Sequence, residues 1–70
     1  MTKLGNNIKQ IRTQQKLTQT QLANRAGTTK NTISSIETGQ FSPTAFLAYK
    51  LCKALNCKFE EAFYIEEKED

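Results

Sequence analysis

The 70-residue sequence contains no histidine, a single proline and only two cysteines. The absence of histidine removes the commonest general base and the commonest protein metal ligand. Two cysteines fall short of the four ligands of a structural zinc site, and Cys52 and Cys57 lack the C-x-x-C spacing of a redox motif. The composition therefore argues against an enzyme and against a metalloprotein, and we expect no cofactor.

Long apolar segments are missing as well. No run of 18 apolar residues is present, and the first residues lack the apolar stretch of a signal peptide. We therefore expect a soluble, cytoplasmic protein without a membrane partner. Hydrophobic residues make up 37% of the chain, which predicts one ordered domain. Since a core of this size rarely supplies more than about 3–5 kcal/mol, we expect either a covalent or metal staple or an oligomer.

The formal net charge of +3 conceals an uneven distribution. Residues 1–59 contain nine basic side chains and one acid, Glu37, so this part carries +8. Residues 60–70 contain six acids and one lysine, so the end of the chain carries −5. A basic body indicates a polyanionic partner such as nucleic acid, with an unevenly charged solvated surface as the alternative. We divide the chain into a domain over residues 1–65 and an acidic tail over residues 66–70.

The spacing of apolar residues is helical almost throughout the chain. Leu4, Ile8 and Ile11 recur at intervals of four and three, which predicts a helix from residue 4. Ser42 and Pro43 are typical of the N-cap and the first position of a later helix. Five helices are expected, over residues 4–15, 19–26, 30–38, 43–55 and 58–63, with a brief strand over residues 63–66.

The start of the second helix carries two signals. Thr18 and Gln21 have the spacing of a capping box, and Leu17 and Leu22 have that of a hydrophobic staple. Gly27 is expected to end this helix, because glycine takes the left-handed conformation without steric cost. The boundaries of the second helix are therefore predicted at residues 19 and 26.

Two short helices joined by a tight glycine turn form a helix-turn-helix when the second exposes small polar side chains. Ala23 is small where the two helices cross, Gly27 makes the turn, and Ile33 and Ile36 anchor the second of them. One of the threonines that follow Gly27 can cap this helix. Because all four positions are in register, the sequence predicts a helix-turn-helix with residues 30–38 as its exposed helix.

The motif extends beyond these four positions. Its residues are Leu17-Thr18-Gln19-Thr20-Gln21-Leu22-Ala23, Gly27-Thr28-Thr29, Ile33-Ser34-Ser35-Ile36-Glu37-Thr38-Gly39 and Pro43, followed by residues 47–55 and 59–63. With them the sequence resembles the Cro/C1-type helix-turn-helix regulators of phages and bacteria, in particular the compact single-domain members, over residues 4–65. Cys52 stands where the family usually has alanine, and Ala62 where it has leucine or isoleucine. The resemblance implies an all-α, five-helix lambda-repressor-like DNA-binding domain, which leaves room for a short C-terminal strand.

The resemblance also assigns roles to exposed residues. It implies that Gln19 contacts a phosphate at the start of the second helix, where unpaired N–H groups and the helix dipole favour an anion; an ordinary exposed glutamine is the alternative. Lysine suits guanine and asparagine suits adenine in the major groove, whereas simple solvent exposure is the alternative for Thr32 and Ser35. Phosphate contacts are expected beside the end of the third helix, partly through backbone N–H groups. The expected base-contacting residues are Thr29, Lys30, Asn31, Thr32 and Ser35, and the further phosphate-contacting residues are Thr38 and Gln40.

Two further features concern assembly rather than contact with nucleic acid. The resemblance implies an ion pair between Arg12 and Glu37 that ties the first helix to the third. Phe59, Phe63 and Ile65 are large apolar residues near the chain end, and we expect them to form a homodimer interface. The alternative is that they close the core of the monomer.

Together these expectations define a sequence-specific transcriptional regulator that binds double-stranded DNA. We expect a homodimer on a palindromic operator, with residues 30–38 in the major groove and no small-molecule effector. A repressor is preferred to an activator, because the outer face of the second helix shows Thr20, Asn24 and Arg25 rather than acids. The DNA-binding component of a controller or toxin–antitoxin system shares this domain. A protein-interaction module that docks through the acidic end is the alternative from another class, and an enzyme ranks last.

Overall fold

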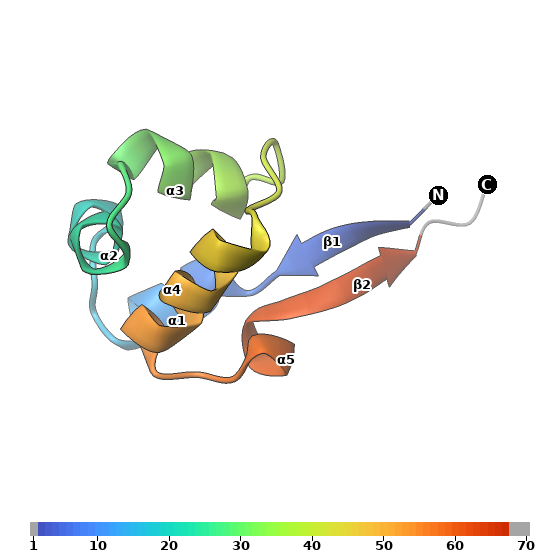
Figure 1. Cartoon of the computed structure of the whole chain (residues 1–70). Coiled ribbons are helices and arrows are strands. Elements are labelled where there is room, and N and C mark those ends of the chain that lie inside the picture. Colours follow the sequence, from blue (N-terminus) through green and yellow to red (C-terminus); the bar gives the residue numbers. More distant parts are fainter. Residues whose placement is uncertain (1, 68–70) are drawn as a thin grey trace.

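The computed structural model describes residues 2–67, which form five helices and a two-stranded sheet (Figure 1). In chain order the elements are β1 (Thr2–Asn6), α1 (Ile8–Gln14), α2 (Gln19–Ala26), α3 (Lys30–Glu37), α4 (Ala45–Leu55), α5 (Phe59–Ala62) and β2 (Phe63–Glu67). The helices pack into one body, and β1 and β2 extend from it side by side (Figure 1). The helical fold class with a helix-turn-helix, predicted from the sequence, is confirmed, and so is the C-terminal strand.

The N-terminal residues form a strand, so the helix predicted from residue 4 is wrong at its start. β1 pairs antiparallel with β2, and Leu4 lies opposite Ile65. α1 begins only at Ile8, whose backbone N–H donates to Oδ1 of Asn6 at 3.1 Å. Glycine and asparagine over residues 5–7 are poor helix formers, and β2 supplies hydrogen-bond partners from the far end of the chain. Because this pairing is not local, the helical spacing of apolar residues gives no sign of it.

The sheet contains one close approach that requires glycine. Gly5 lies opposite Tyr64 in the register. A Cβ atom on Gly5 would lie 2.4 Å from Cε1 of the Tyr64 ring, so any other residue would push the ring aside. The aromatic ring therefore covers the backbone of β1.

The acidic end of the chain begins inside this sheet. Glu66 and Glu67, predicted as the first residues of a tail, are the last two residues of β2. Residues 68–70 of that predicted tail lie outside the described residues. Within residues 2–67, none of the helices is both long enough and apolar enough to cross a membrane.

The capping signals around the helix-turn-helix are confirmed. The Gln21 N–H donates to Oγ1 of Thr18 at 3.0 Å, and the Thr18 N–H donates to Oε1 of Gln21 at 2.8 Å, which completes the capping box. Gly27 has a φ of 69° and ends α2 in the left-handed conformation. Thr29 caps α3, because its Oγ1 accepts the Thr32 N–H at 3.2 Å. These bonds define where α2 ends and where α3 begins.

α4 starts later than the sequence predicts. Its N-cap is Thr44, whose Oγ1 accepts the Leu47 N–H at 3.2 Å, so the assignment of Ser42 and Pro43 to the N-cap and first position is wrong. Ser42, Pro43 and Thr44 all favour the start of a helix. Thr44 is the N-cap because its hydroxyl accepts the backbone N–H three residues later. At the other end Asn56 has a φ of 52° and stops the helix where the sequence predicts.

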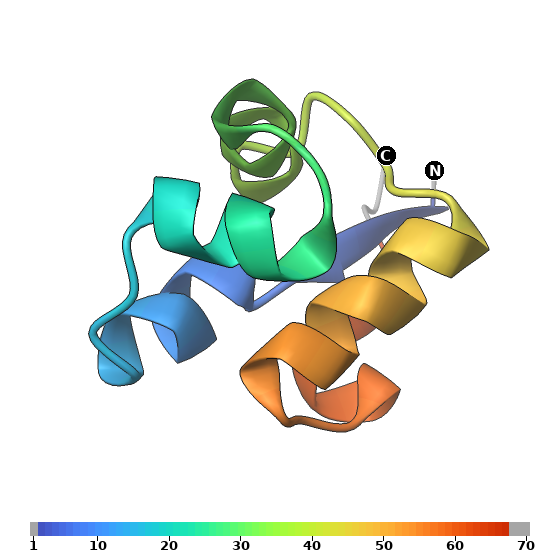
Figure 2. The same cartoon turned by 60° about the vertical axis from the view of Figure 1, so that its left-hand side comes forward.

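The core lies between the helices and is closed by the beginning of β2. Its largest fully buried side chains are Ile8, Leu22, Ile33, Ile36, Leu51 and Leu55. α2 packs against both α3 and α4, so α4 supports the helix-turn-helix through α2 (Figure 2). Phe63, at 3% exposure, belongs to this core. The prediction that Phe63 forms a dimer interface is therefore wrong, because its own chain already covers it.

The start of α4 gives a test with a matched control. We expect Thr44→Ala to lower the free energy of unfolding by about 1 kcal/mol, because the Leu47 N–H loses its acceptor. Ser42→Ala removes a hydroxyl two residues earlier and should leave stability unchanged. Urea denaturation of both variants measures the difference. A larger loss for Ser42→Ala would place the cap where the sequence had predicted it.

Candidate nucleic-acid interface

The third helix presents a polar face to solvent. Ile33 and Ile36, the only apolar residues of α3, are fully buried. Lys30 and Asn31 are exposed, and the hydroxyl side chains next along the helix are partly exposed. α3 lies at the outer edge of the body in both views, on the opposite side from α5 (Figures 1 and 2). Nothing in residues 2–67 covers this face, so a large ligand can reach it.

Two of the predicted base-contacting hydroxyls contact one another. The Oγ1 atoms of Thr29 and Thr32 are 3.0 Å apart, and Thr29 also accepts the Thr32 N–H. Only one hydrogen can lie between the two oxygens, so the second hydroxyl hydrogen remains able to donate to an outside acceptor. Thr29 therefore combines a structural role, as the cap of α3, with a polar group at the exposed end of the helix.

A side chain that sequence reasoning missed lies beside this face. Phe41 is 45% exposed and lines a shallow hollow together with Asn31, Thr32 and Ser35. Its position follows from the turn after α3, since the Phe41 N–H donates to the Ser35 carbonyl at 3.1 Å. In the sequence, a phenylalanine between polar loop residues was the one sign that this position could matter. Phe41 gives the otherwise polar face an apolar wall.

Gln19 is positioned by the buried end of α3. Its Nε2 donates to Oε1 of Glu37 at 2.9 Å, so the side chain lies across from the start of α2 to α3. The Gln21 N–H is already capped by Thr18, whereas the N–H groups of the first two residues of any α-helix have no intrahelical partner. At the start of α2, the Gln19 amide is therefore held in place beside the positive end of the helix dipole.

The turn after α3 differs from the prediction. The N–H of Thr38 donates to Ser34 at 3.1 Å, and the N–H of Gln40 donates to Ser35 at 2.9 Å. The Thr38 hydroxyl also donates to the Ser35 carbonyl, at 3.2 Å. The expectation that backbone N–H groups here contact phosphates is wrong, because these donors already satisfy the last carbonyls of α3. The Gln40 side chain is exposed and remains a candidate.

Arg12 and Glu37 form the ion pair that the resemblance implies. Nε of Arg12 lies 2.7 Å from Oε2 of Glu37, and Nη2 of Arg12 donates to Oε1 at 3.3 Å. The remaining Arg12 contact, from Nη1 to the Leu17 carbonyl, is 2.8 Å long. Both side chains are almost fully buried, with 10% and 3% of their surfaces exposed. The pair joins α1, the turn before α2 and the last residue of α3.

The arrangement described so far is shared by a known family. The helix-turn-helix family model matches residues 8–61, which include α1 to α4 and most of α5. The protein is a Cro/C1-type helix-turn-helix regulator. DNA binding and transcription regulation are the properties of this family.

Relatives cover almost the whole regulator. The uncharacterized HTH-type transcriptional regulator YgzD of Bacillus subtilis is 36% identical over 65 residues, 93% of this chain and 98% of its own. An uncharacterized HTH-type transcriptional regulator of Methanocaldococcus jannaschii is 38% identical over 66 residues, 94% of this chain and 100% of its own. The competence pilus inhibition repressor of Acinetobacter baylyi is 39% identical over 69 residues, 96% of this chain but 61% of its own.

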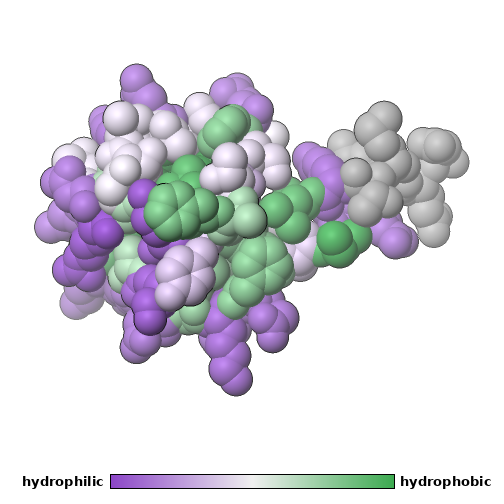
Figure 3. All heavy atoms as spheres, in the orientation of Figure 1, coloured by the Kyte–Doolittle hydropathy of each residue, from purple (hydrophilic) through white to green (hydrophobic). Residues whose placement is uncertain are grey.

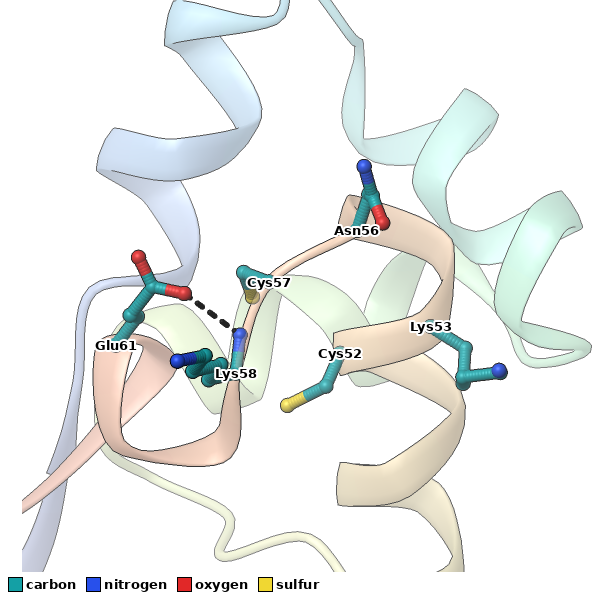
Figure 4. Close-up of a pocket in the computed structure, with 6 residues that line it drawn as sticks. All are labelled: Cys52, Lys53, Asn56, Cys57, Lys58 and Glu61. Atoms are coloured by element: carbon teal, nitrogen blue, oxygen red, sulfur yellow. Dashed lines mark hydrogen bonds between the residues drawn. The ribbon is translucent and has the colours of Figure 1, made fainter.

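The regulator has another hollow, away from α3. It lies between the end of α4 and α5, and its lining includes Cys52, Lys53, Cys57 and Glu61 (Figure 4). Burial raises the pKa of the Cys52 thiol to about 11, with a smaller contribution from Cys57. Burial also raises the pKa of Cys57. Both thiols are therefore protonated near neutral pH and poorly suited to bind a metal ion or to act as nucleophiles.

The ion pair of the regulator gives a second test. Glu37→Gln leaves the buried Arg12 without a counter-charge, so we expect a lower melting temperature and a loss of about 3–5 kcal/mol in the free energy of unfolding. DNA affinity should fall only indirectly, because Glu37 positions α3 and Gln19 and is not itself among the proposed DNA-contacting residues. Glu60→Gln, which removes an exposed acid on α5, is the control and should melt like the wild type. Circular dichroism measures both, and unchanged melting of Glu37→Gln would contradict a structural role.

Proposed function

We propose that the regulator is a sequence-specific repressor that binds a palindromic operator as a homodimer, with α3 in the major groove. The observation that carries this proposal is the exposed polar face of α3, which is braced from behind by Gln19 and the Arg12–Glu37 pair. A major groove of B-DNA is wide enough to admit one helix. The chromosome on which such a protein acts lies in the cytoplasm of a prokaryotic cell.

Base recognition is assigned to the exposed face of α3. Lys30 has the length and charge to reach O6 and N7 of guanine, and the Asn31 amide can make two hydrogen bonds to adenine. Phe41 adds an apolar surface for a thymine methyl group. This assignment is supported by the hollow that Phe41 lines together with Asn31. The hydroxyl groups that complete the face are those of Thr29, Thr32 and Ser35.

Phosphate contacts fix the register of the duplex on this face. The start of α2, with Gln19, offers an anion site at a helix N-terminus. Gln40 offers an exposed amide on the far side of α3, whereas the hydroxyl hydrogen of Thr38 is already donated to Ser35. The acids of α5 lie on the side of the body opposite α3, where they do not oppose the phosphates (Figure 1).

The homodimer is assigned to the apolar surface away from α3. Ile65 is 63% exposed on β2, and Phe59 is 49% exposed and stacks on Phe63, with ring centroids 5.0 Å apart. Phe46 and Tyr49 of α4 add to the exposed apolar area, and apolar side chains gather over α4 with hydrophilic ones around them (Figure 3). Exposed apolar patches favour association. Two copies would present α3 to half-sites about 34 Å apart.

Repression is favoured over activation on two grounds. The outer residues of α2, Thr20, Asn24 and Arg25, are exposed and include no acid for contact with a polymerase. The relative in Acinetobacter baylyi is named a repressor. The same domain would also serve in a controller or toxin–antitoxin system, and this finer assignment does not change the contacts proposed for DNA.

Binding-site selection from randomised duplexes tests sequence recognition. We expect Lys30→Ala and Asn31→Ala each to relax the preference at one position of the selected site, by about 1–3 kcal/mol. Lys58→Ala, a lysine next to α5 on the other side of the molecule, should keep the full preference. If both α3 variants also keep it, the assignment of α3 to base recognition is overturned.

A salt titration separates DNA binding from the alternative of a protein-interaction module. A regulator that neutralises phosphates loses affinity steeply as salt rises, because condensed counterions are released on binding. We expect this steep loss even with random duplex. Absence of binding at low salt would favour the interaction module instead.

Sedimentation equilibrium tests the homodimer. At micromolar concentration we expect a species of twice 7.9 kDa for the wild type. Ile65→Ser removes an exposed apolar side chain from the proposed interface and should shift the mass towards the monomer without unfolding it. Leu17→Ala, in the monomer core, is expected to lower stability without this specific shift. A wild-type protein that sediments only at 7.9 kDa contradicts the dimer.

A further inference from the structure

The strand that sequence reasoning missed brings a lysine to the end of the recognition helix. Nζ of Lys3 lies 3.9 Å from the position that a Cβ atom on Gly39 would occupy. Gly39 is in the turn that directly follows α3, with a φ of 83°. Lys3, Thr38 and Gly39 line one hollow together with Glu66 of the opposite strand. β1 therefore delivers an ammonium group from the first residues of the chain to the C-terminal end of α3.

This end of α3 has few donors of its own. The backbone N–H groups of Thr38, Gly39 and Gln40 all donate to carbonyls of α3, at 3.1, 3.1 and 2.9 Å. A helix C-terminus also carries a partial negative charge, which disfavours an approaching phosphate. A duplex phosphate beside this end of α3 therefore needs a cation, and the ammonium of Lys3 lies next to the Cβ position of Gly39.

The present partner of Lys3 is a weakly held carboxylate. Glu66 lies opposite Lys3 in the sheet register, with Nζ and Oε2 3.7 Å apart. Their side chains are 51% and 41% exposed, and ion pairs as exposed as this contribute little to stability. The pair holds the lysine beside the turn without burying it. A phosphate oxygen can therefore replace Glu66 at a small energetic cost.

We propose that Lys3 is a phosphate-contacting residue of the regulator, and that it exchanges Glu66 for a DNA phosphate next to the end of α3. The ligand is a phosphodiester of the duplex backbone, so the contact adds affinity and orientation without reading sequence. This inference rests on the proposed docking of α3 in the major groove. It gives the two-stranded sheet a part in DNA binding in addition to its part in the fold.

The slope of affinity against salt is the test. We expect Lys3→Gln to weaken binding to the selected operator at low salt and to reduce the slope of log K against log salt by about 0.9 per bound subunit. The selected sequence should not change, because no base contact is removed. Lys58→Gln is the matched control and should leave the slope as in the wild type.

The opposite partner gives a prediction of opposite sign. Glu66→Gln removes the carboxylate that competes with the phosphate, so binding at low salt should become tighter than in the wild type. Glu67→Gln removes the same charge from the neighbouring residue of β2 and should tighten binding less. If the Lys3–Glu66 pair only stabilised the fold, Lys3→Gln and Glu66→Gln would both melt at a lower temperature and both bind DNA more weakly.

The outcomes separate the inference from the function on which it rests. Lys3→Gln with the wild-type slope and affinity overturns the role of Lys3 alone. Wild-type protein that binds no duplex at low salt overturns the proposed function and the role of Lys3 with it. Melting curves of all four variants are needed to check that each is folded at the temperature of the titration.

Discussion

The buried ion pair between Arg12 and Glu37 is the interaction that fixes the position of α3 on the rest of the molecule. α3 is eight residues long and its only apolar residues are Ile33 and Ile36, so apolar contacts alone fasten it weakly. Burying two charges is costly unless every donor and acceptor finds a partner, and here the guanidinium donates to the carboxylate and to the Leu17 carbonyl. Through Glu37, α3 is therefore held to α1 and to the turn before α2.

The proposed functions lie on different parts of the surface of the regulator. Gln19 links the carboxylate of Glu37 to the start of α2, so the proposed phosphate site and the proposed base-reading face belong to one rigid unit. The exposed apolar side chains lie elsewhere, on α4, α5 and β2, where a second copy can cover them. The uneven charge of the sequence follows this division only in part: the acids of α5 lie opposite α3, whereas Glu66 of β2 lines the hollow at the end of α3 (Figure 1).

Local chemistry accounts for the parts of the fold that the sequence predicts correctly. The capping box at Thr18 and the left-handed Gly27 involve neighbours in the chain, so spacing alone reveals them. β1 depends on a partner some sixty residues away, and the burial of Phe63 depends on the path of β2; neither leaves a local pattern. The candidate site follows the same division: the exposed face of α3 was predicted, whereas Phe41 and Lys3 required the three-dimensional arrangement.

A residue-resolved titration with duplex DNA tests whether α3 is the helix that contacts the operator. Backbone amide shifts of the ¹⁵N-labelled regulator, followed as a selected operator is added, map the surface that the duplex touches. We predict that the largest changes fall at the start of α2 and along residues 29–35, with little change in the core around the Arg12–Glu37 pair. Changes confined to the apolar side, at α4 and α5, would contradict the assignment of α3 as the DNA-reading helix.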